Sequence, residues 1–217
     1  MPTPGVLVEL IDFEPEDRRQ AWADWYDRTY LVERSRLDGV MAARRGARAS
    51  GSVQNIVVYD LADVTVPLSA SWRDLDRRLE AGAAAEDAVK AALTRSESLL
   101  YRQILSTVER YEPPDAQVLH GAFFEAHPTD HDEFNDWYNT EHVLFVDVID
   151  GYLNCRRFQS LEDPSKFLAL YDVTTLEVAT SDETAKANES PWTDRIRSKV
   201  ATYRERRLFS IERAERG

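Results

Sequence analysis

Short apolar runs alternate with longer amphipathic stretches along the 217 residues of this chain. The runs IVVYDL and FLALYDV are rich in β-branched and aromatic residues and have the length of a strand. Residues at helical spacing, such as Tyr138 and His142, favour helices between such runs. We expect strands near residues 6–11, 40–46, 54–60, 103–109, 118–124, 152–159, 166–173 and 206–213, and helices near residues 15–36, 83–98, 129–149 and 183–199.

The chain repeats itself at an offset of 112 residues, which places Asp24-Trp25-Tyr26 over Asp136-Trp137-Tyr138. Across positions 24–45, seven of the 22 residues match their counterparts without a gap. Typical residue usage gives roughly one or two matches by chance. The prolines of the segment 112–115 prevent a helix or central strand from continuing there. The sequence therefore predicts an internal duplication, with domains at residues 1–112 and 113–217.

Each copy has the element order β-α-β-β-α-β, which is that of a ferredoxin-like module. Both helices of such a module cover one face of its sheet, so the other face must pack on something else. We expect an α+β fold in which two ferredoxin-like βαββαβ modules in one chain form a pseudo-dimeric α+β barrel. A small-molecule pocket is expected between the two sheets.

The segment DWYNTEHVLFVDVIDGY, residues 136–152, concentrates polar and aromatic chemistry in one helix. Tyr138, His142 and Phe145 recur at helical spacing, so we expect them on one face. The pKa range of imidazole suits proton transfer near neutrality, which makes His142 the main catalytic candidate. Tyr138 and Glu141 are further catalytic candidates. The alternative is a half-buried His142 that hydrogen-bonds a backbone carbonyl.

The order WYNTEH, DGY, CRRF and FLALYDV resembles the EthD-like branch of the dimeric α+β barrel superfamily. The resemblance covers residues 118–175 well. It covers the first copy weakly, where Thr29 and Tyr30 stand in place of Glu141 and His142. Members of the superfamily include small cofactor-free monooxygenases, lactone isomerases, decarboxylases and cyclases of aromatic polyketides, and haem-binding peroxidases. The resemblance implies the fold and a degenerate site in the first copy, and it leaves the reaction open.

Further candidates for substrate contact each have a structural alternative. Trp137 recurs as Trp25 in the first copy, which favours packing. Adjacent strand residues point to opposite faces, so at most one of Arg156 and Arg157 faces a pocket as an anion clamp, and ion pairs with nearby acids are the alternative. The predicted substrate-binding residues are Asn139, Trp137, His120, Arg156, Arg157, Phe145 and Tyr30.

No metal or cofactor site is predicted. His127 and His131 lie near acidic residues, but Pro128 interrupts their spacing. The eight glycines are scattered and form no phosphate-binding loop. The single cysteine, Cys155, excludes an internal disulfide and fits a reducing compartment.

The net charge of −12 disfavours nucleic acid and anionic membranes as partners. No basic segment leads into an apolar run at the N-terminus, and no stretch approaches the roughly 20 apolar residues that span a bilayer. We therefore expect a cytoplasmic protein with a small-molecule substrate, and a homodimer is left open.

Three functions compete. The first is a cofactor-independent enzyme in which His142 moves a proton on a small, mostly apolar, aromatic or polyketide-like substrate, as in a lyase, decarboxylase, cyclase or isomerase. The second is a haem-dependent or cofactor-free oxygenase or peroxidase. The third is a non-catalytic small-ligand-binding protein.

Overall fold

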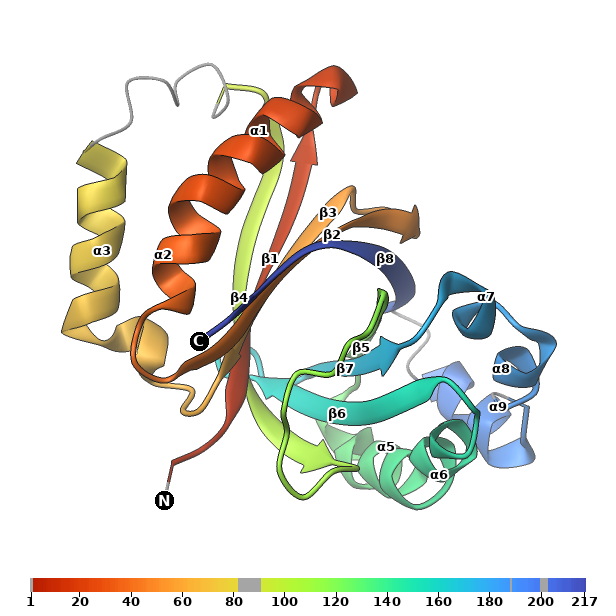
Figure 1. Cartoon of the computed structure of the whole chain (residues 1–217). Coiled ribbons are helices and arrows are strands. Elements are labelled where there is room, and N and C mark those ends of the chain that lie inside the picture. The colour runs from red at the N-terminus through yellow and green to blue at the C-terminus, as the bar shows by residue number, and fades with distance from the viewer. Residues whose placement is uncertain (1, 82–90, 188, 200–202) are drawn as a thin grey trace. The chain divides into compact units, whose positions relative to one another are not determined.

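The computed structural model describes residues 2–81, 91–187, 189–199 and 203–217 (Figure 1). The chain divides into two compact units. Unit 1 contains residues 1–48, 52–100 and 211–217, and unit 2 contains residues 49–51 and 101–210.

Unit 1 is an antiparallel sheet with helices α1, α2 and α3 against it (Figure 1). A continuous helical segment between the first two strands changes from α to π geometry and back to α. The hydrogen-bonded strand order in this unit is β4-β1-β3-β2-β8. The elements are β1 (Gly5–Phe13), η1 (Glu16–Arg18), α1 (Arg19–Tyr26), the π-helix η2 (Asp27–Leu31), α2 (Val32–Ser35), β2 (Val40–Ser50), β3 (Asn55–Leu61), η3 (Val66–Leu68), α3 (Ala70–Ala81) and β4 (Leu93–Ser106).

Unit 2 has a second antiparallel sheet, with strand order β8-β5-β7-β6-β4. Its first helical segment also contains a π-helical turn. The elements are β5 (Val118–Glu125), η4 (Pro128–Asp130), α5 (His131–Trp137), the π-helix η5 (Tyr138–His142), α6 (Val143–Asp147), β6 (Tyr152–Ser160), β7 (Lys166–Val173), α7 (Leu176–Ala179), α8 (Asp182–Lys186), α9 (Pro191–Lys199) and β8 (Tyr203–Arg216).

Strands β4 and β8 belong to both orders because each continues from one unit into the other. In hydrogen-bonded order the described strands therefore form the closed series β1-β3-β2-β8-β5-β7-β6-β4. This is the strand order of a closed α+β barrel. The α+β class expected from the sequence is confirmed.

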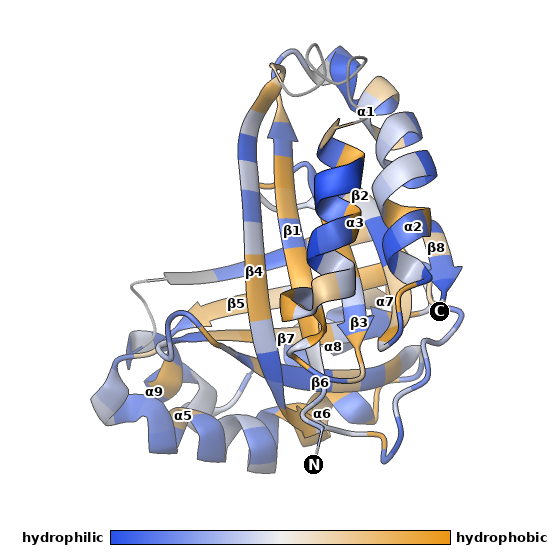
Figure 2. Ribbon diagram, turned by 90° about the vertical axis from the view of Figure 1, so that its left-hand side faces the viewer, coloured by the Kyte–Doolittle hydropathy of each residue, from blue (hydrophilic) through white to orange (hydrophobic). Residues whose placement is uncertain are grey.

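Each unit has its own apolar core between its sheet and its helices. The core of unit 1 includes Trp22, Tyr26 and Tyr59, and that of unit 2 includes Trp137 and Tyr171. Burial of such aromatic side chains stabilises the fold by about 25 cal/mol per Å² of apolar surface. Figure 2 shows the matching colour pattern, with β1 mostly hydrophobic and α1 and α3 mixed along their length.

The helix expected near residues 83–98 is wrong for residues 93–98, which belong to strand β4, and residues 82–90 lie outside the described part of the chain. The helix of this region is α3. It buries Trp72 and Leu75, which are three positions apart on one face.

The helix expected near residues 183–199 is divided into α8 and α9. Pro191 is the first residue of α9, a position where its missing N–H costs no hydrogen bond. The remaining expected strands and helices are found, with ends that differ by a few residues except at β4, which begins ten residues earlier than expected.

Candidate active site

A pocket lies in unit 2 between the sheet and its covering helices. Its cavity volume is about 40 Å³, which is room for about three waters. Its position differs from the expected one, between two sheets. The lining residues are His120, Ala122, Phe124, His142, Val146, Tyr152, Tyr171, Thr184, Glu205 and Arg206.

The π-helix η5 holds His142 against two aromatic rings. The imidazole stacks on Trp137, with ring centroids 4.8 Å apart and an interplanar angle of 19°. It meets Tyr138 edge-on at 4.8 Å. Trp137 is itself fixed, because its indole N–H donates to Thr193 Oγ1 at 3.1 Å. The aromatic pair of this helix therefore orients the one imidazole that the helix contributes to the pocket.

His120 reaches the same pocket from strand β5. It lies opposite Tyr171 of β7 and stacks on its ring at 4.9 Å. Arg206 Nε donates to His120 Nε2 at 3.0 Å, and His120 Nδ1 lies 3.2 Å from the hydroxyl of Tyr152. Because a guanidinium can only donate, Nε2 must be the accepting nitrogen and Nδ1 carries the proton towards Tyr152.

The electrostatic environment keeps His120 uncharged. Burial lowers the pKa of His120 well below its usual value, and the charges of Arg206 and His142 lower it further. His120 is therefore a neutral imidazole at neutral pH, ready to accept a proton once its lone pair is available.

Tyr152 and Thr184 add hydroxyl groups to the pocket wall. Burial raises the pKa of Tyr152, while its hydrogen bond with Thr184 and the charge of Arg206 oppose that rise. Thr184 also donates to the carbonyl of Val178 at 2.8 Å, which fixes its hydroxyl. The hydroxyl of Tyr152 accepts the hydrogen bond from His120 Nδ1–H and so positions the imidazole.

Tyr138 lies in the core behind the pocket. Its hydroxyl is 2.6 Å from the hydroxyl of Tyr171. Burial is the main cause that raises the pKa of Tyr171 well above its usual value, so this phenol stays protonated. The guanidinium of Arg157 lies over the Tyr138 ring at 4.1 Å from its centroid. Tyr138 thus supports the pocket wall rather than lining it.

Glu141 and Phe145 do not line the pocket. Glu141 accepts a hydrogen bond from Ser190 at 2.5 Å, and Phe145 remains 43% exposed. In the α-helix α6 that follows His142, the third and fourth residues onward both lie near it around the helix. The fourth, Val146, lines the pocket, and the third, Phe145, does not.

Neither member of the arginine pair lines the pocket. Arg157 donates to Asn139 and, at 3.0 Å, to Asn135, which ties the strand to the helix above it. Arg156 lies 3.4 Å from the ring centroid of Tyr111 and is buried. Asn139 is therefore engaged by Arg157 in this structure.

The sequence missed Tyr152, Thr184, Val146 and Arg206. Tyr152 directly follows the Asp150-Gly151 turn, where Gly151 has a φ of 95°, and this turn sets the start of β6. The aromatic residue directly after this turn is the local feature of the sequence that could have drawn attention to Tyr152. For Arg206 and Thr184 the sequence carries no comparable signal.

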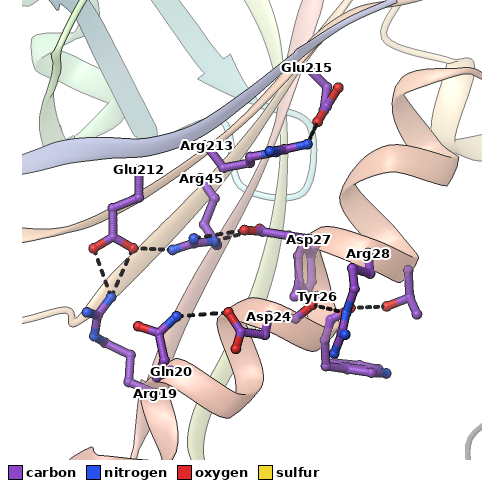
Figure 3. Close-up of polar contacts among 12 residues, drawn as sticks. Arg19, Gln20, Asp24, Tyr26, Asp27, Arg28, Arg45, Glu212, Arg213 and Glu215 are labelled. Atoms are coloured by element: carbon purple, nitrogen blue, oxygen red, sulfur yellow. Dashed lines mark hydrogen bonds and ion pairs between the residues drawn. The ribbon is translucent and has the colours of Figure 1, made fainter.

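Tyr30, the remaining predicted contact, lies in unit 1. It stacks on Tyr26 at 5.5 Å and is covered by the guanidinium of Arg34 at 4.8 Å from its ring centroid. Figure 3 shows the charged network beside this helix, where Arg45 joins Asp27 on the helix to Glu212 on β8.

The pocket of unit 2 does not fit a haem. Pockets that enclose ligands of drug size have volumes of about 300–1,000 Å³. This one holds about three waters and is walled by Phe124, Tyr171 and Val146. Among the described residues, no three side chains of His, Cys, Asp or Glu come together as metal ligands. Cys155 is buried, and burial raises the pKa of its thiol to about 12.

Comparison with known proteins identifies the fold. No protein-family model matches this chain, and neither does any curated protein sequence. An anthrone oxidase-like protein superposes with a TM-score of 0.67 and 12% identity, over 100% of this chain and 94% of its own. A monooxygenase candidate from Fusobacterium nucleatum subsp. nucleatum gives 0.64 and 11%, over 99% and 95% of the two chains. A mutant chlorite dismutase from Candidatus Nitrospira defluvii gives 0.59 and 10%, over 97% and 93%.

These identities show the fold alone. The chain has the α+β fold of the dimeric α+β barrel, ferredoxin-like proteins. In the described part of the chain, no helix combines the length and the apolar character needed to cross a membrane.

Proposed function

We propose that this chain is a small-molecule enzyme that moves a proton between its substrate and an imidazole in the pocket of unit 2. The observation that carries the proposal is that two buried imidazoles, His120 and His142, line one small cavity. One of them is kept neutral by burial, whose effect is to lower its pKa. Structural neighbours named as a monooxygenase candidate and a chlorite dismutase support an enzyme of this fold.

The chemistry begins at an acidic C–H or O–H group of the substrate. The imidazole accepts the proton, and the bonding electrons stay on the substrate as an enolate or phenolate. Return of the same proton to another atom gives an isomer, and loss of a leaving group gives a lyase product. His142 is the proposed acid–base group, since Trp137 and Tyr138 hold its ring in one orientation.

The pocket wall favours a compact, mostly apolar substrate. Ala122, Phe124 and Val146 supply apolar surface, and the ring of Tyr171 supplies a flat one. The cavity of about 40 Å³ is smaller than a six-membered ring needs, so even a single ring requires the exposed side chain of Arg206 to swing away from the pocket. A single aromatic or cyclic ring needs a smaller movement than a fused polyketide.

We also propose that the two units arose by internal duplication and that unit 2 belongs to the EthD-like branch. The offset of 112 residues supports this, because it carries Tyr26 and Tyr59 onto Tyr138 and Tyr171. Each pair forms the same contact between hydroxyls, at 2.7 Å and 2.6 Å respectively. The strand orders β4-β1-β3-β2 and β8-β5-β7-β6 give further support.

Hydrogen–deuterium exchange tests the proposed function without knowledge of the product. Cyclohexane-1,3-dione, phenylpyruvate and anthrone, incubated in D₂O with the protein, lose their acidic C–H signals in proton NMR if the pocket abstracts them. We expect accelerated exchange on at least one of them. His142→Ala should lower the rate by about 10²- to 10⁴-fold.

His127→Ala is the matched control, because His127 is an exposed histidine of the same unit outside the pocket. Full exchange in His142→Ala would refute the acid–base role. Saturable binding of these compounds without any accelerated exchange would favour a non-catalytic binding protein instead.

A cofactor-free oxygenase is the second candidate, and it shares the first step. The names of two structural neighbours, anthrone oxidase-like protein and monooxygenase candidate, favour it. An enolate or phenolate formed in the pocket would transfer electrons to O₂, which becomes reduced as the substrate is oxidised. Oxygen uptake measured with the same compounds separates the two candidates, since isomerase or lyase chemistry consumes no O₂.

A further inference from the structure

Arg206 is an exposed cation whose hydrogen-bond partners, His120, Tyr152 and the carbonyl of Ala179, are all neutral. Its Nε donates to His120 Nε2 at 3.0 Å, and its Nη2 donates to the carbonyl of Ala179. Among the described residues, Arg206 forms no ion pair with a carboxylate. Its neighbour Glu205 also lines the pocket, but it bonds Arg207 at 2.5 Å.

This pairing is unusual in a chain with 39 acidic and 27 basic residues. Acidic partners outnumber the cations, and most arginines of unit 1 in Figure 3 contact carboxylates. A carboxylate or other oxyanion offers the guanidinium an opposite charge and two acceptor atoms in one plane, which neither an imidazole nor a single carbonyl can give. A ligand oxyanion therefore competes well for the donors that Arg206 now gives to His120 and Ala179.

We propose that Arg206 recognises a planar oxyanion of the substrate, a carboxylate or the enolate of a cyclic 1,3-dicarbonyl, and that this contact withdraws its N–H from His120. The substrate class implied is a small aromatic or cyclic acid. The part that concerns His120 rests on the proposed function, because the release of Nε2 provides the pocket with a second proton acceptor.

Geometry links binding to activation. While Arg206 donates to Nε2, the lone pair of His120 is occupied, and the Nδ1 proton points to Tyr152. When the guanidinium turns to an anion, Nε2 faces the pocket with its lone pair free. The charge of Arg206 is one cause of the lowered pKa of His120, so neutralising that charge also makes the imidazole more basic.

Binding of benzoate tests the recognition step by itself. Benzoate, benzamide and the enolate of cyclohexane-1,3-dione are titrated into the full chain by isothermal calorimetry at pH 7.5. We expect Arg206→Gln to weaken both anions at least about 10-fold, the effect of losing one charge-assisted hydrogen bond, and to leave benzamide unchanged. Arg206→Lys should recover part of the loss, since it keeps the charge without the planar pair of donors.

Arg110→Gln is the matched control, because Arg110 is a highly exposed arginine of the same unit outside the pocket. An equal loss in Arg110→Gln would mean that only the overall charge matters, and it would overturn the proposal. Unchanged anion affinity in Arg206→Gln, or no saturable binding of either anion, would overturn it as well. Weakening of one anion alone identifies which oxyanion is recognised.

The release of His120 has its own readout. Nitrogen-15 chemical shifts of the histidine rings report which nitrogen accepts a hydrogen bond, and saturation with benzoate should shift His120 Nε2 and leave His127 unmoved. No shift would refute the coupling. Because neither measurement involves turnover, Arg206-dependent binding without proton exchange refutes the proposed enzyme function alone. His142-dependent exchange with Arg206-independent binding refutes this inference alone.

Discussion

The cores of the two units, where helices cover the sheet, share a tyrosine pair and a π-helical segment, but the side chains around the pair differ. Each has a tyrosine pair joined through its hydroxyls, Tyr26 with Tyr59 and Tyr138 with Tyr171. Each pair lies beside a π-helical segment. In unit 1 the guanidinium of Arg34 lies against the hydroxyls of the pair, and in unit 2 the pocket lies beside Tyr171.

Two substitutions account for much of the difference. In unit 1, Arg34 pairs with Glu9 at 2.8 Å and with Asp76 at 2.9 Å, and Glu9 also bonds Tyr26. The counterpart of Arg34 at the 112-residue offset is Val146. Both it and Ala122, the counterpart of Glu9, line the pocket.

The equivalence of Glu9 with Ala122 follows from strand register. Leu7 lies opposite Tyr59, and His120 lies opposite Tyr171, so each residue two positions later is also matched. Where unit 1 has an ion pair beside its tyrosine pair, unit 2 has small apolar side chains and a pocket. The imidazoles occupy places where unit 1 has Leu7 and Tyr30.

The largest effect is expected from exchanging His142 and Tyr30, the residues at the same position of the two units. His142→Tyr gives unit 2 the residue of unit 1, and proton exchange should fall by about 10²- to 10⁴-fold. Tyr30→His should create no activity, because the ion pair of Arg34 still fills its surroundings. Exchange rates in D₂O measure both. His142→Ala separates loss of the base from crowding by the larger ring, and activity in Tyr30→His would contradict the comparison.

Removal of one partner of the Arg34–Glu9 ion pair should destabilise unit 1. Arg34→Val leaves the half-buried carboxylate of Glu9 without its cation, and we expect a loss of about 3 kcal/mol in the free energy of unfolding. The double variant Glu9→Ala/Arg34→Val imitates unit 2 and should recover much of that loss. Urea denaturation measures both variants. If the double variant is as unstable as the single one, the loss of stability does not come from the unpaired charge of Glu9.

Stability should depend on pH through His120, which has no titratable counterpart at Leu7. Burial lowers the pKa of His120 in the folded chain below its unfolded value of about 6.5. Between these two pKa values the unfolded chain binds the extra proton, so stability falls as the pH drops below about 6.5. The expected slope is about 1.4 kcal/mol per pH unit. Urea denaturation from pH 7.5 to 4.5 measures it, and His120→Gln should reduce the slope.

The sequence could predict most of the strands and helices of the two units and their order along the chain. The strand runs are apolar and the repeat is ungapped across residues 24–45, so element order follows from pattern. Helix α3 could not be found in this way, because its charged residues hide the stripe of Trp72 and Leu75.

The pocket could be foreseen only in part. His120 and His142 were candidates because of residue chemistry and face, and both line it. Phe145 was expected beside His142 because helical spacing alone does not decide between the third and fourth following residues, and the structure places Val146 at the pocket instead. Arg206 lies on β8, far along the sequence from His120 on β5, so no local sequence pattern could show that the two residues meet.

The smallest expected effect concerns the arginines that join strand to helix. In unit 1, Arg45 holds the carboxylate of Asp27 through two hydrogen bonds, at 2.7 and 2.9 Å (Figure 3). In unit 2, Arg157 holds the amide of Asn139 instead, and burial lowers the pKa of Arg157. Charged acceptors form stronger hydrogen bonds than amides, so Asp27→Asn should cost about 1 kcal/mol and Asn139→Asp should add a similar amount.

Urea denaturation at pH 7 measures both exchanges, and the pair of variants is its own control, because each makes one unit resemble the other. If Asn139→Asp destabilises the chain, desolvation of the new carboxylate outweighs its pairing with Arg157. If Asn139→Asp slows proton exchange without changing stability, the amide of Asn139 contacts the substrate, although Arg157 engages it in this structure. Equal and opposite shifts would instead mean that the amide is a weaker form of the same structural tie.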